Sequence, residues 1–267
     1  MRAGRSGSAA VLAGALALGA FTAPSAEAAD TGITVSKLVV NKGKPVIVGT
    51  DAEVTPGFTY HMSWPSGPKL PDVDAFPFLY HDTTAAKGAD SGGIYMNYTN
   101  CVEDGTHAAD CDGELYIDPR WRLDSNNDAT TWKIAVTARI WGSNGQPKSQ
   151  EYLTGFGSVQ VKRRAQVAVN AAPEPVAKGK KITVTGRITR ADWVKHTYTG
   201  FGGKAAKLQF RKAGTSSYST VKIVSADSAG YLKTTVTAAA DGYWRWTFSE
   251  TSTTGGASAA GDYVDVK

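Results

Sequence analysis

The sequence predicts an all-β protein that consists of two tandem β-sandwich domains after a signal peptide. In almost every candidate element, apolar and polar residues alternate with the period of two that is typical of half-buried strands. Clusters of Gly, Asp and Ser separate these short runs, and the chain after residue 29 lacks the pattern of a long amphipathic helix. Several motifs also recur in the same order in both halves, which indicates two copies of one fold.

The first 29 residues have the three parts of a secretory signal. Two arginines precede an apolar run from Ala9 to Phe21, and residues 26–28 supply the small side chains of a cleavage site. The apolar run is too short to span a bilayer. We therefore expect cleavage after Ala28 or one residue later, and a secreted, extracellular protein without a membrane span.

Three pairs of matching segments indicate an internal duplication with a boundary near residue 164. The first copy is about two dozen residues longer between its first matching glycine and its tryptophan, and we expect the extra residues within Pro65–Asp118. A lengthened loop on a rigid β-sandwich is a common place for ligand recognition. We therefore expect a first domain at 30–164 with lengthened loops, and a second at 165–267. The matches are 42–48 with 178–184, 132–136 with 244–248, and 159–162 with 264–267.

The second half divides into short alternating segments separated by turn residues. Seven strands in about 100 residues fit an immunoglobulin-like β-sandwich. The expected strands are Gln166–Val169, Lys181–Arg187, Lys207–Lys212, Ser219–Ser225, Tyr231–Thr237, Tyr243–Ser249 and Tyr263–Val266.

One strand of the second half is unusually rich in aromatic residues. Trp244, Trp246 and Phe248 share one face of it, because alternate residues of a strand point the same way. We interpret this face as part of the domain core. The alternative is an exposed aromatic stripe that stacks on sugars.

Six motifs of the second half carry a family resemblance. It resembles the bacterial Ig-like domain of secreted actinobacterial proteins over essentially all of 165–267. The first half is similar to the N-terminal domain of the same proteins through its cysteine pair and its tryptophan strand. The resemblance implies the fold and an extracellular location, some members carry a calcium-binding label, and it lends no catalytic residue. The motifs are 178–186, 207–211, 218–222, 227–236, 241–246 and 261–266.

The chain has two cysteines, Cys101 and Cys111, both in the first half. In an exported protein, an isolated pair this close in sequence is most simply a disulfide, and the turn around Gly105 allows the chain to double back. The alternative is a metal or redox pair, but the C-x-x-C spacing and a neighbouring histidine cluster are absent. We therefore predict one disulfide in the first domain.

Charge is unevenly distributed along the chain. The formal net charge is +5, but residues 30–164 carry 13 basic and 16 acidic side chains, whereas residues 165–267 carry 14 basic and 7 acidic ones. The basic excess indicates an anionic partner for the second half, such as an envelope polymer or a glycan. The alternative is a lysine-rich surface that protects edge strands from pairing. The residues expected at a polymer-binding surface are Lys178, Lys180, Lys181, Lys204, Lys207, Arg211 and Lys212.

The residues Asp124, Asn126 and Asp128 have the D-x-N-x-D spacing of a calcium loop. An EF-hand is excluded, because Ala129 and Ala135 stand where that loop needs its glycine and its glutamate. We keep the three residues as candidate ligands of a weakly held calcium ion, with an Asx-rich turn as the alternative. A second acidic group lies around Cys111 and comprises Asp104, Asp110, Asp112 and Glu114.

The sequence contains no catalytic constellation that we assign, and it lacks phosphate-binding, dinucleotide-binding and nucleic-acid-binding motifs. Asp90–Gly93 matches the core of a chymotrypsin-type nucleophile motif, but Ala89 replaces the glycine that precedes it, and His81 lies close upstream. A glycine-rich turn explains the motif better. We expect a non-catalytic binding or structural protein. The alternative is a secreted hydrolase that uses carboxylates within Pro65–Asp118.

Overall fold

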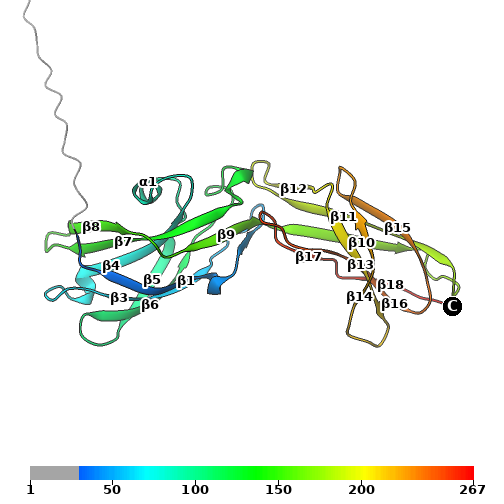
Figure 1. Ribbon diagram of the computed structural model, residues 1–267, viewed down its shortest axis with the longest axis horizontal. Coiled ribbons are helices and arrows are strands. Elements are labelled where there is room, and N and C mark those ends of the chain that lie inside the picture. Colours follow the sequence, from blue (N-terminus) through cyan, green and yellow to red (C-terminus); the bar gives the residue numbers. More distant parts are fainter. Residues whose placement is uncertain (1–29) are drawn as a thin grey trace, which may run out of the picture.

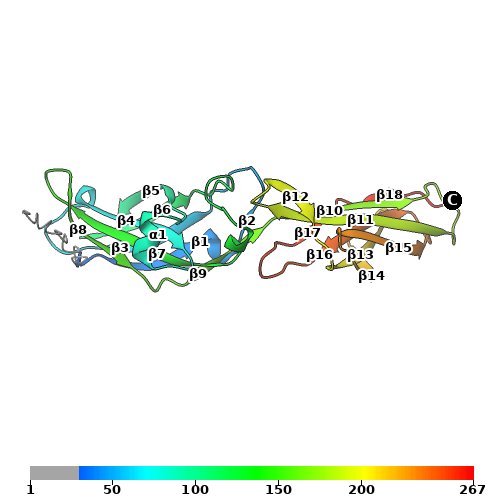
Figure 2. The same cartoon turned by 90° about the horizontal axis from the view of Figure 1, so that it is seen from above.

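The computed structural model describes residues 30–267, so the signal peptide expected at residues 1–29 lies outside the described part of the chain. The strands of this part form four sheets, which pack in two pairs. Figures 1 and 2 show the two pairs as β-sandwiches that lie end to end. The predicted fold class, all-β with tandem immunoglobulin-like sandwiches, is confirmed. No helix of residues 30–267 is both long and apolar enough to cross a bilayer.

The first sandwich has one four-stranded and one five-stranded sheet, and a short helix α1 (Ala85–Asp90) lies beside β4. One sheet has the order β1-β3-β6-β5, with β1 Thr34–Val40, β3 Gly57–Ser63, β6 Ala108–Leu115 and β5 Met96–Glu103. The other has the order β2-β9-β7-β4, with β8 also paired to β7. Its strands are β2 Val46–Val48, β9 Ser158–Arg163, β7 Thr131–Trp141, β4 Val73–Tyr80 and β8 Pro147–Leu153.

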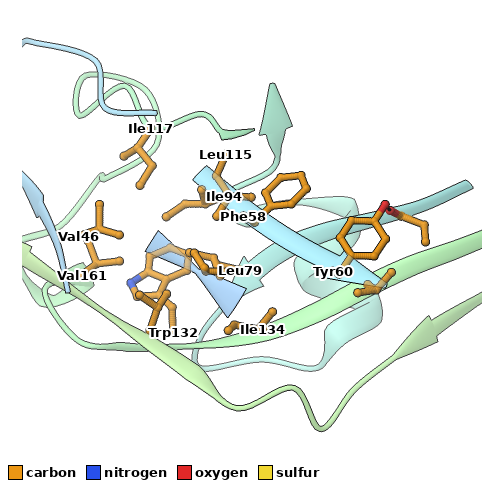
Figure 3. Close-up of a cluster of buried hydrophobic side chains, with 14 of the residues drawn as sticks. Val46, Phe58, Tyr60, Leu79, Ile94, Leu115, Ile117, Trp132, Ile134 and Val161 are labelled. Atoms are coloured by element: carbon orange, nitrogen blue, oxygen red, sulfur yellow. Dashed lines mark hydrogen bonds between the residues drawn. The ribbon is translucent and has the colours of Figure 1, made fainter. Parts of the chain in front are cut away.

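The two sheets of the first sandwich enclose an apolar core that is centred on Trp132 of β7 (Figure 3). Phe58 and Leu79 face this core from β3 and β4, on opposite sheets, and both are buried. The indole nitrogen of Trp132 donates a hydrogen bond to the carbonyl of Asp128 at 2.8 Å, so its polar atom is satisfied inside the core.

The cysteine pair links two neighbouring strands at one edge of the first sandwich. Cys101 of β5 and Cys111 of β6 are direct cross-strand partners, and they form a disulfide. The predicted disulfide is therefore confirmed. It ties β5, the edge strand of its sheet, to its neighbour β6.

The second sandwich contains every strand that the sequence predicts, together with two short strands, β12 and β17, that it does not predict. One sheet has the order β10-β11-β12, with β15 also paired to β11. The other has the order β14-β13-β16-β17, with β18 also paired to β16. The first group is β10 Ala165–Ala172, β11 Lys181–Asp192, β12 Thr197–Gly200 and β15 Tyr231–Thr237. The second group is β14 Ser219–Ser225, β13 Ala205–Lys212, β16 Gly242–Phe248, β17 Ala257–Ser258 and β18 Asp262–Val264.

The aromatic face of β16 forms the centre of the second core. Trp244, Trp246 and Phe248 are all buried, and they pack against residues of both sheets. The indole nitrogen of Trp246 reaches across the sandwich and donates to the carbonyl of Thr185 on β11 at 3.0 Å. The core interpretation of these residues is confirmed, and the exposed sugar-stacking stripe on this face is wrong.

Two of the three matched segment pairs occupy corresponding positions in the two sandwiches. The tryptophan strands β7 and β16 both lie centrally in their sheets, and β9 and β18 follow them as last strands. The first match pairs strands that are not equivalent. Segment 42–48 leads into β2, which pairs in parallel with β9, whereas segment 178–184 leads into β11, which pairs with β10 and β15. The parallel contact of β2 has its counterpart in the bridge between Val176 and Val266.

The two sandwiches are joined by a single residue. β9 ends at Arg163 and β10 begins at Ala165, so only Arg164 lies between the last strand of one sandwich and the first strand of the other. The Arg164 amide donates to the carbonyl of Val48 at 2.8 Å, and its carbonyl accepts from the amide of Ala191 at 2.8 Å. The connection is therefore hydrogen-bonded to both sandwiches and leaves no flexible linker.

A loop of the second sandwich continues the sheet of the first. Residues 250–255 follow the edge of β9, where the Arg163 amide donates to the carbonyl of Thr253 and the Arg163 carbonyl accepts from the amide of Gly255, each at 3.0 Å. The ammonium of Lys162 pairs with Glu250 at 3.0 Å. These contacts cover the end of β9 that extends beyond its pairing with β7 and would otherwise be open to another chain.

The side chain of Arg163 is buried at the junction. Its guanidinium donates to the carbonyl of Ala191 in the second sandwich. Burial and, to a smaller extent, the neighbouring Arg190 lower the pKa of Arg163 to about 10, so it stays charged at neutral pH.

Trp193 of the second sandwich is buried in the first sandwich and holds the two together. It follows directly after β11, yet its side chain is fully buried within the core cluster of the first sandwich. Its indole nitrogen donates to the carbonyl of Gly49 at 2.8 Å, and its backbone amide donates to the side-chain oxygen of Asn126 at 3.0 Å. The Asn126 amide group in turn donates to Asp192 at 3.0 Å. The Trp193 side chain is therefore shielded from water only when the two sandwiches are in contact, and its burial favours that contact.

Replacing Trp246 by alanine is expected to lower the free energy of unfolding by about 3–5 kcal/mol, because the change empties a fully buried site and removes the hydrogen bond to Thr185. Denaturant unfolding followed by circular dichroism measures the effect. Trp121→Ala is the control, since this side chain is 76% exposed and its loss should change stability by less than about 0.5 kcal/mol. Equal losses in the two variants would contradict the core assignment.

Replacing Trp193 by alanine is expected to uncouple the two sandwiches, because it removes a large side chain of the second sandwich that is buried in the core of the first. Scanning calorimetry should show one cooperative transition for the parent chain and two separated transitions for the variant. Val194→Ala, which changes an exposed neighbour, should leave a single transition. If Trp193→Ala also keeps a single, unshifted transition, the burial of Trp193 is not what couples the sandwiches.

Candidate functional site: a tyrosine–arginine surface

The outer face of one sheet of the second sandwich carries a cluster of aromatic and basic side chains. On β16, the residues that alternate with the buried tryptophans are Tyr243 and Arg245, and they face away from the core. On β13, Arg211 faces outward beside Tyr243, its cross-strand partner. Tyr263 of β18 and Tyr218, just before β14, complete the group. We call these five residues the tyrosine–arginine surface.

Cation–aromatic contacts and one edge-to-face ring contact join the five side chains into one continuous layer. The guanidinium of Arg245 lies 3.7 Å from the ring centre of Tyr218, and that of Arg211 lies 4.1 Å from Tyr243 and 5.3 Å from Tyr218. The rings of Tyr243 and Tyr263 are 5.0 Å apart. Each cation–aromatic contact of this kind contributes about 0.5–1 kcal/mol at an exposed site. The layer is therefore ordered before any ligand binds.

Hydrogen bonds hold the two guanidinium groups in place. Arg245 Nε donates to the side-chain oxygen of Gln209 at 2.8 Å, and the same oxygen accepts from Thr247 Oγ1 at 3.1 Å. Arg211 donates to the carbonyl of Thr215 at 2.6 Å. A guanidinium has five N–H donors, and each of these two makes one hydrogen bond to the described chain. Most of their donors therefore stay available to a ligand.

The positive charge of this surface is not neutralised by salt bridges. None of the ion pairs found in residues 30–267 includes Arg211 or Arg245. Burial, with smaller contributions from Asp241 and Asp265, raises the pKa of Tyr263, so its phenol stays protonated at neutral pH. The Asp241 carboxylate accepts a hydrogen bond from the amide of Val266 at 2.7 Å and so supports the fold.

This arrangement combines two kinds of recognition. An arginine guanidinium binds a carboxylate or phosphate group with two parallel hydrogen bonds. A tyrosine face packs against an apolar, ring-shaped surface such as that of a sugar. The surface is therefore suited to a polymer that carries both rings and negative charges.

The predicted basic residues are divided between the two sheets of the second sandwich. Lys178, Lys180 and Lys181 are exposed at the start of β11, whereas Lys204, Lys207, Arg211 and Lys212 lie on or beside β13 of the opposite sheet. Only Arg211 of this set belongs to the tyrosine–arginine surface. The polymer-binding role of the other six stays a prediction.

The structure divides the predicted calcium ligands: Asp124 and Asp128 line one pocket, whereas Asn126 is hydrogen-bonded to the second sandwich. The oxygen of Asn126 already accepts from the Trp193 amide, and one oxygen of Asp128 accepts from the Ser125 amide at 2.9 Å. Asp124 is exposed beside them. A separate group, His61, Asp104 and Asp110, brings imidazole and carboxylate atoms within 4.8 Å of one another on the first sandwich. His61 there is hydrogen-bonded to Asp110 at 2.7 Å, and calcium binding stays a prediction.

Sequence reasoning missed most of this surface. Tyr243 and Arg245 are visible in the sequence as the polar face of a strand with a tryptophan core, and that alternation is the signal that points to them. Tyr218 and Tyr263 come from distant segments, and only the pairing of β14 with β13, β13 with β16 and β16 with β18 brings them together.

Comparisons with known proteins give no close relative. No protein-family model and no curated protein matches the chain. Among solved structures, it is similar to the ectodomain (Ig1–Ig3) of mouse nectin-like molecule 4, with 12% identity and a TM-score of 0.25, over 88% of this chain and 64% of that chain. It is also similar to fibronectin(III)-like modules of Clostridium thermocellum CbhA, with 13% identity and a TM-score of 0.28, over 88% and 92% of the two chains. The chain thus spans just under two thirds of the nectin-like ectodomain, and we take the fold class from its own strand order.

Proposed function

We propose that this chain is a secreted, non-catalytic binding protein whose tyrosine–arginine surface binds an acidic polysaccharide. The single observation that carries the proposal is the contact of Arg211 and Arg245 with tyrosine rings, while each guanidinium makes only one hydrogen bond to the described chain. Carboxylates or phosphates of the polymer bind the guanidinium groups, and sugar rings pack on the tyrosines.

The charge of the second sandwich supports the choice of an anionic ligand. Residues 165–267 carry 14 basic and 7 acidic side chains, so their overall field attracts a polyanion over distances longer than a contact. This attraction is weakly selective, because salt screens it with a Debye length of about 8 Å at physiological ionic strength. The rings and guanidinium groups of the surface add the selectivity that diffuse charge lacks.

An extracellular location fits this ligand. The signal-like pattern of residues 1–29 and the disulfide between Cys101 and Cys111 both favour an oxidising compartment outside the cytoplasm. In that compartment, acidic envelope and extracellular polysaccharides are the polyanions that such a protein meets.

Binding of the purified full chain to immobilised polygalacturonate tests the proposal. The chain should bind at low salt, and the Arg211→Ala/Arg245→Ala variant should bind at least about tenfold more weakly, because it loses two charge-assisted contacts. Neutral dextran should not compete, and polyglutamate, which has the charge without the sugar rings, should compete poorly.

The matched control is Arg187→Ala/Lys233→Ala on the opposite sheet. Arg187 also stacks on a tyrosine, 4.7 Å from the ring centre of Tyr231, so this control removes the same charge and a similar contact elsewhere. It should bind polygalacturonate nearly as well as the parent. If both double variants lose the same affinity, binding is due to diffuse charge and the proposed surface is wrong; if the parent does not bind at low salt, the function is wrong.

A further inference from the structure

The first sandwich has a separate pocket, of about 340 Å³, far along the chain from the tyrosine–arginine surface. It lies where the end of β4, the turn after α1 and the segment that follows β6 meet. Its volume falls at the lower end of the range of small-ligand sites, which begins at roughly 300 Å³. Its lining residues are His81, Thr83, Ser91, Gly92, Gly93, Trp121, Arg122, Asp124, Asp128 and Trp132.

Trp121 stands at this pocket with 76% of its surface exposed. It belongs to an ordered turn, because both its amide and that of Arg122 donate to the carbonyl of Asp118, at 3.1 and 2.9 Å. Leu123, two residues later, is buried in the core and anchors the other side of the turn. The indole is therefore exposed to solvent on a hydrogen-bonded turn beside a polar cavity.

The interior of the pocket is polar and pre-ordered. His81 packs edge-on against Trp132, with ring centres 4.2 Å apart, and its two ring nitrogens lie 2.8 Å from Asp82 and 3.5 Å from Asp128. Asp124, Asp128, Thr83 and Ser91 add carboxylate and hydroxyl oxygens to the lining.

The glycines of the Asp90–Gly93 motif shape one wall of the pocket. Gly92 has a φ of +75°, which favours glycine, and a side chain at Gly93 would meet the carbonyl oxygen of Gly88 at 2.4 Å. The motif therefore closes a tight turn, as expected from its sequence, and brings the Ser91 hydroxyl to the pocket.

We propose that this pocket binds a neutral sugar residue of a glycan, with Trp121 stacking on the sugar ring and the Asp124 and Asp128 carboxylates accepting hydrogen bonds from its hydroxyls. One exposed tryptophan above hydroxyl and carboxylate acceptors matches the amphipathic faces of a pyranose ring. An anionic sugar is disfavoured, because the two carboxylates of the lining outnumber Arg122. An aromatic cage for a quaternary ammonium is disfavoured as well, because Trp132 is buried and offers no second open ring.

The purified full chain tests this inference by saturation-transfer NMR and tryptophan fluorescence. The probes are neutral oligosaccharides of β-glucose, α-glucose, N-acetylglucosamine, mannose, galactose and xylose. At least one should bind at millimolar concentration or below, with an affinity that salt does not change, since no charge on the ligand is screened. Trp121→Ala should weaken that binding about tenfold or more, and Asp124→Asn should weaken it less.

Two variants serve as controls. Tyr98→Ala removes an exposed aromatic residue of β5 outside the pocket, and Arg211→Ala/Arg245→Ala disables the tyrosine–arginine surface; both should keep the neutral-sugar affinity. Absence of binding by every probe would overturn the inference, as would equal binding by Trp121→Ala. A site that takes Ca²⁺ and is lost in Asp124→Asn, with no sugar bound, would overturn it in favour of a metal site. None of these results depends on whether polygalacturonate binds the second sandwich.

Discussion

The burial of Trp193 in the neighbouring sandwich is the constraint on which the shape of the molecule depends. A tryptophan buries a large apolar surface, and here its two polar hydrogens also find partners, the Gly49 carbonyl and the Asn126 side chain. With Arg164 as the only connecting residue and the 250–255 loop along β9, the junction has a packed core, a covalent link and an extended backbone contact. Interfaces between domains of one chain are commonly polar and allow relative motion, whereas this junction includes a fully buried tryptophan.

A rigid junction matters for function because the two candidate sites lie on different sandwiches. The segment that lines the pocket of the first sandwich, through Asp124 and Asp128, also supplies Asn126, which binds the second sandwich. The pocket is thus built on the same loop that closes the junction. A fixed separation lowers the loss of conformational entropy when a ligand engages two sites on one chain, compared with a flexibly linked pair.

The sequence predicted those features that depend on local periodicity. The alternation of Trp244, Trp246 and Phe248 identified both a strand and its buried face, and the short spacing of Cys101 and Cys111 identified the disulfide. The junction was not predictable in this way, because a buried tryptophan next to a strand has the same local pattern whichever core receives it. Asn126, a candidate calcium ligand by its spacing, is also a junction residue, and its local sequence did not indicate this role. The matched segments 42–48 and 178–184 both begin with Lys-Gly-Lys but lead into non-equivalent strands, so a shared turn chemistry does not establish structural equivalence.

Residual dipolar couplings of the backbone amides, measured on the whole chain in one alignment medium, test the rigid junction most directly. A single alignment tensor, fitted jointly to the amides of both sandwiches with the inter-sandwich orientation of Figure 1, should reproduce all the couplings. Trp193→Ala should require two tensors. If the parent chain itself needs two tensors of different magnitude, the sandwiches move independently, which contradicts a rigid junction.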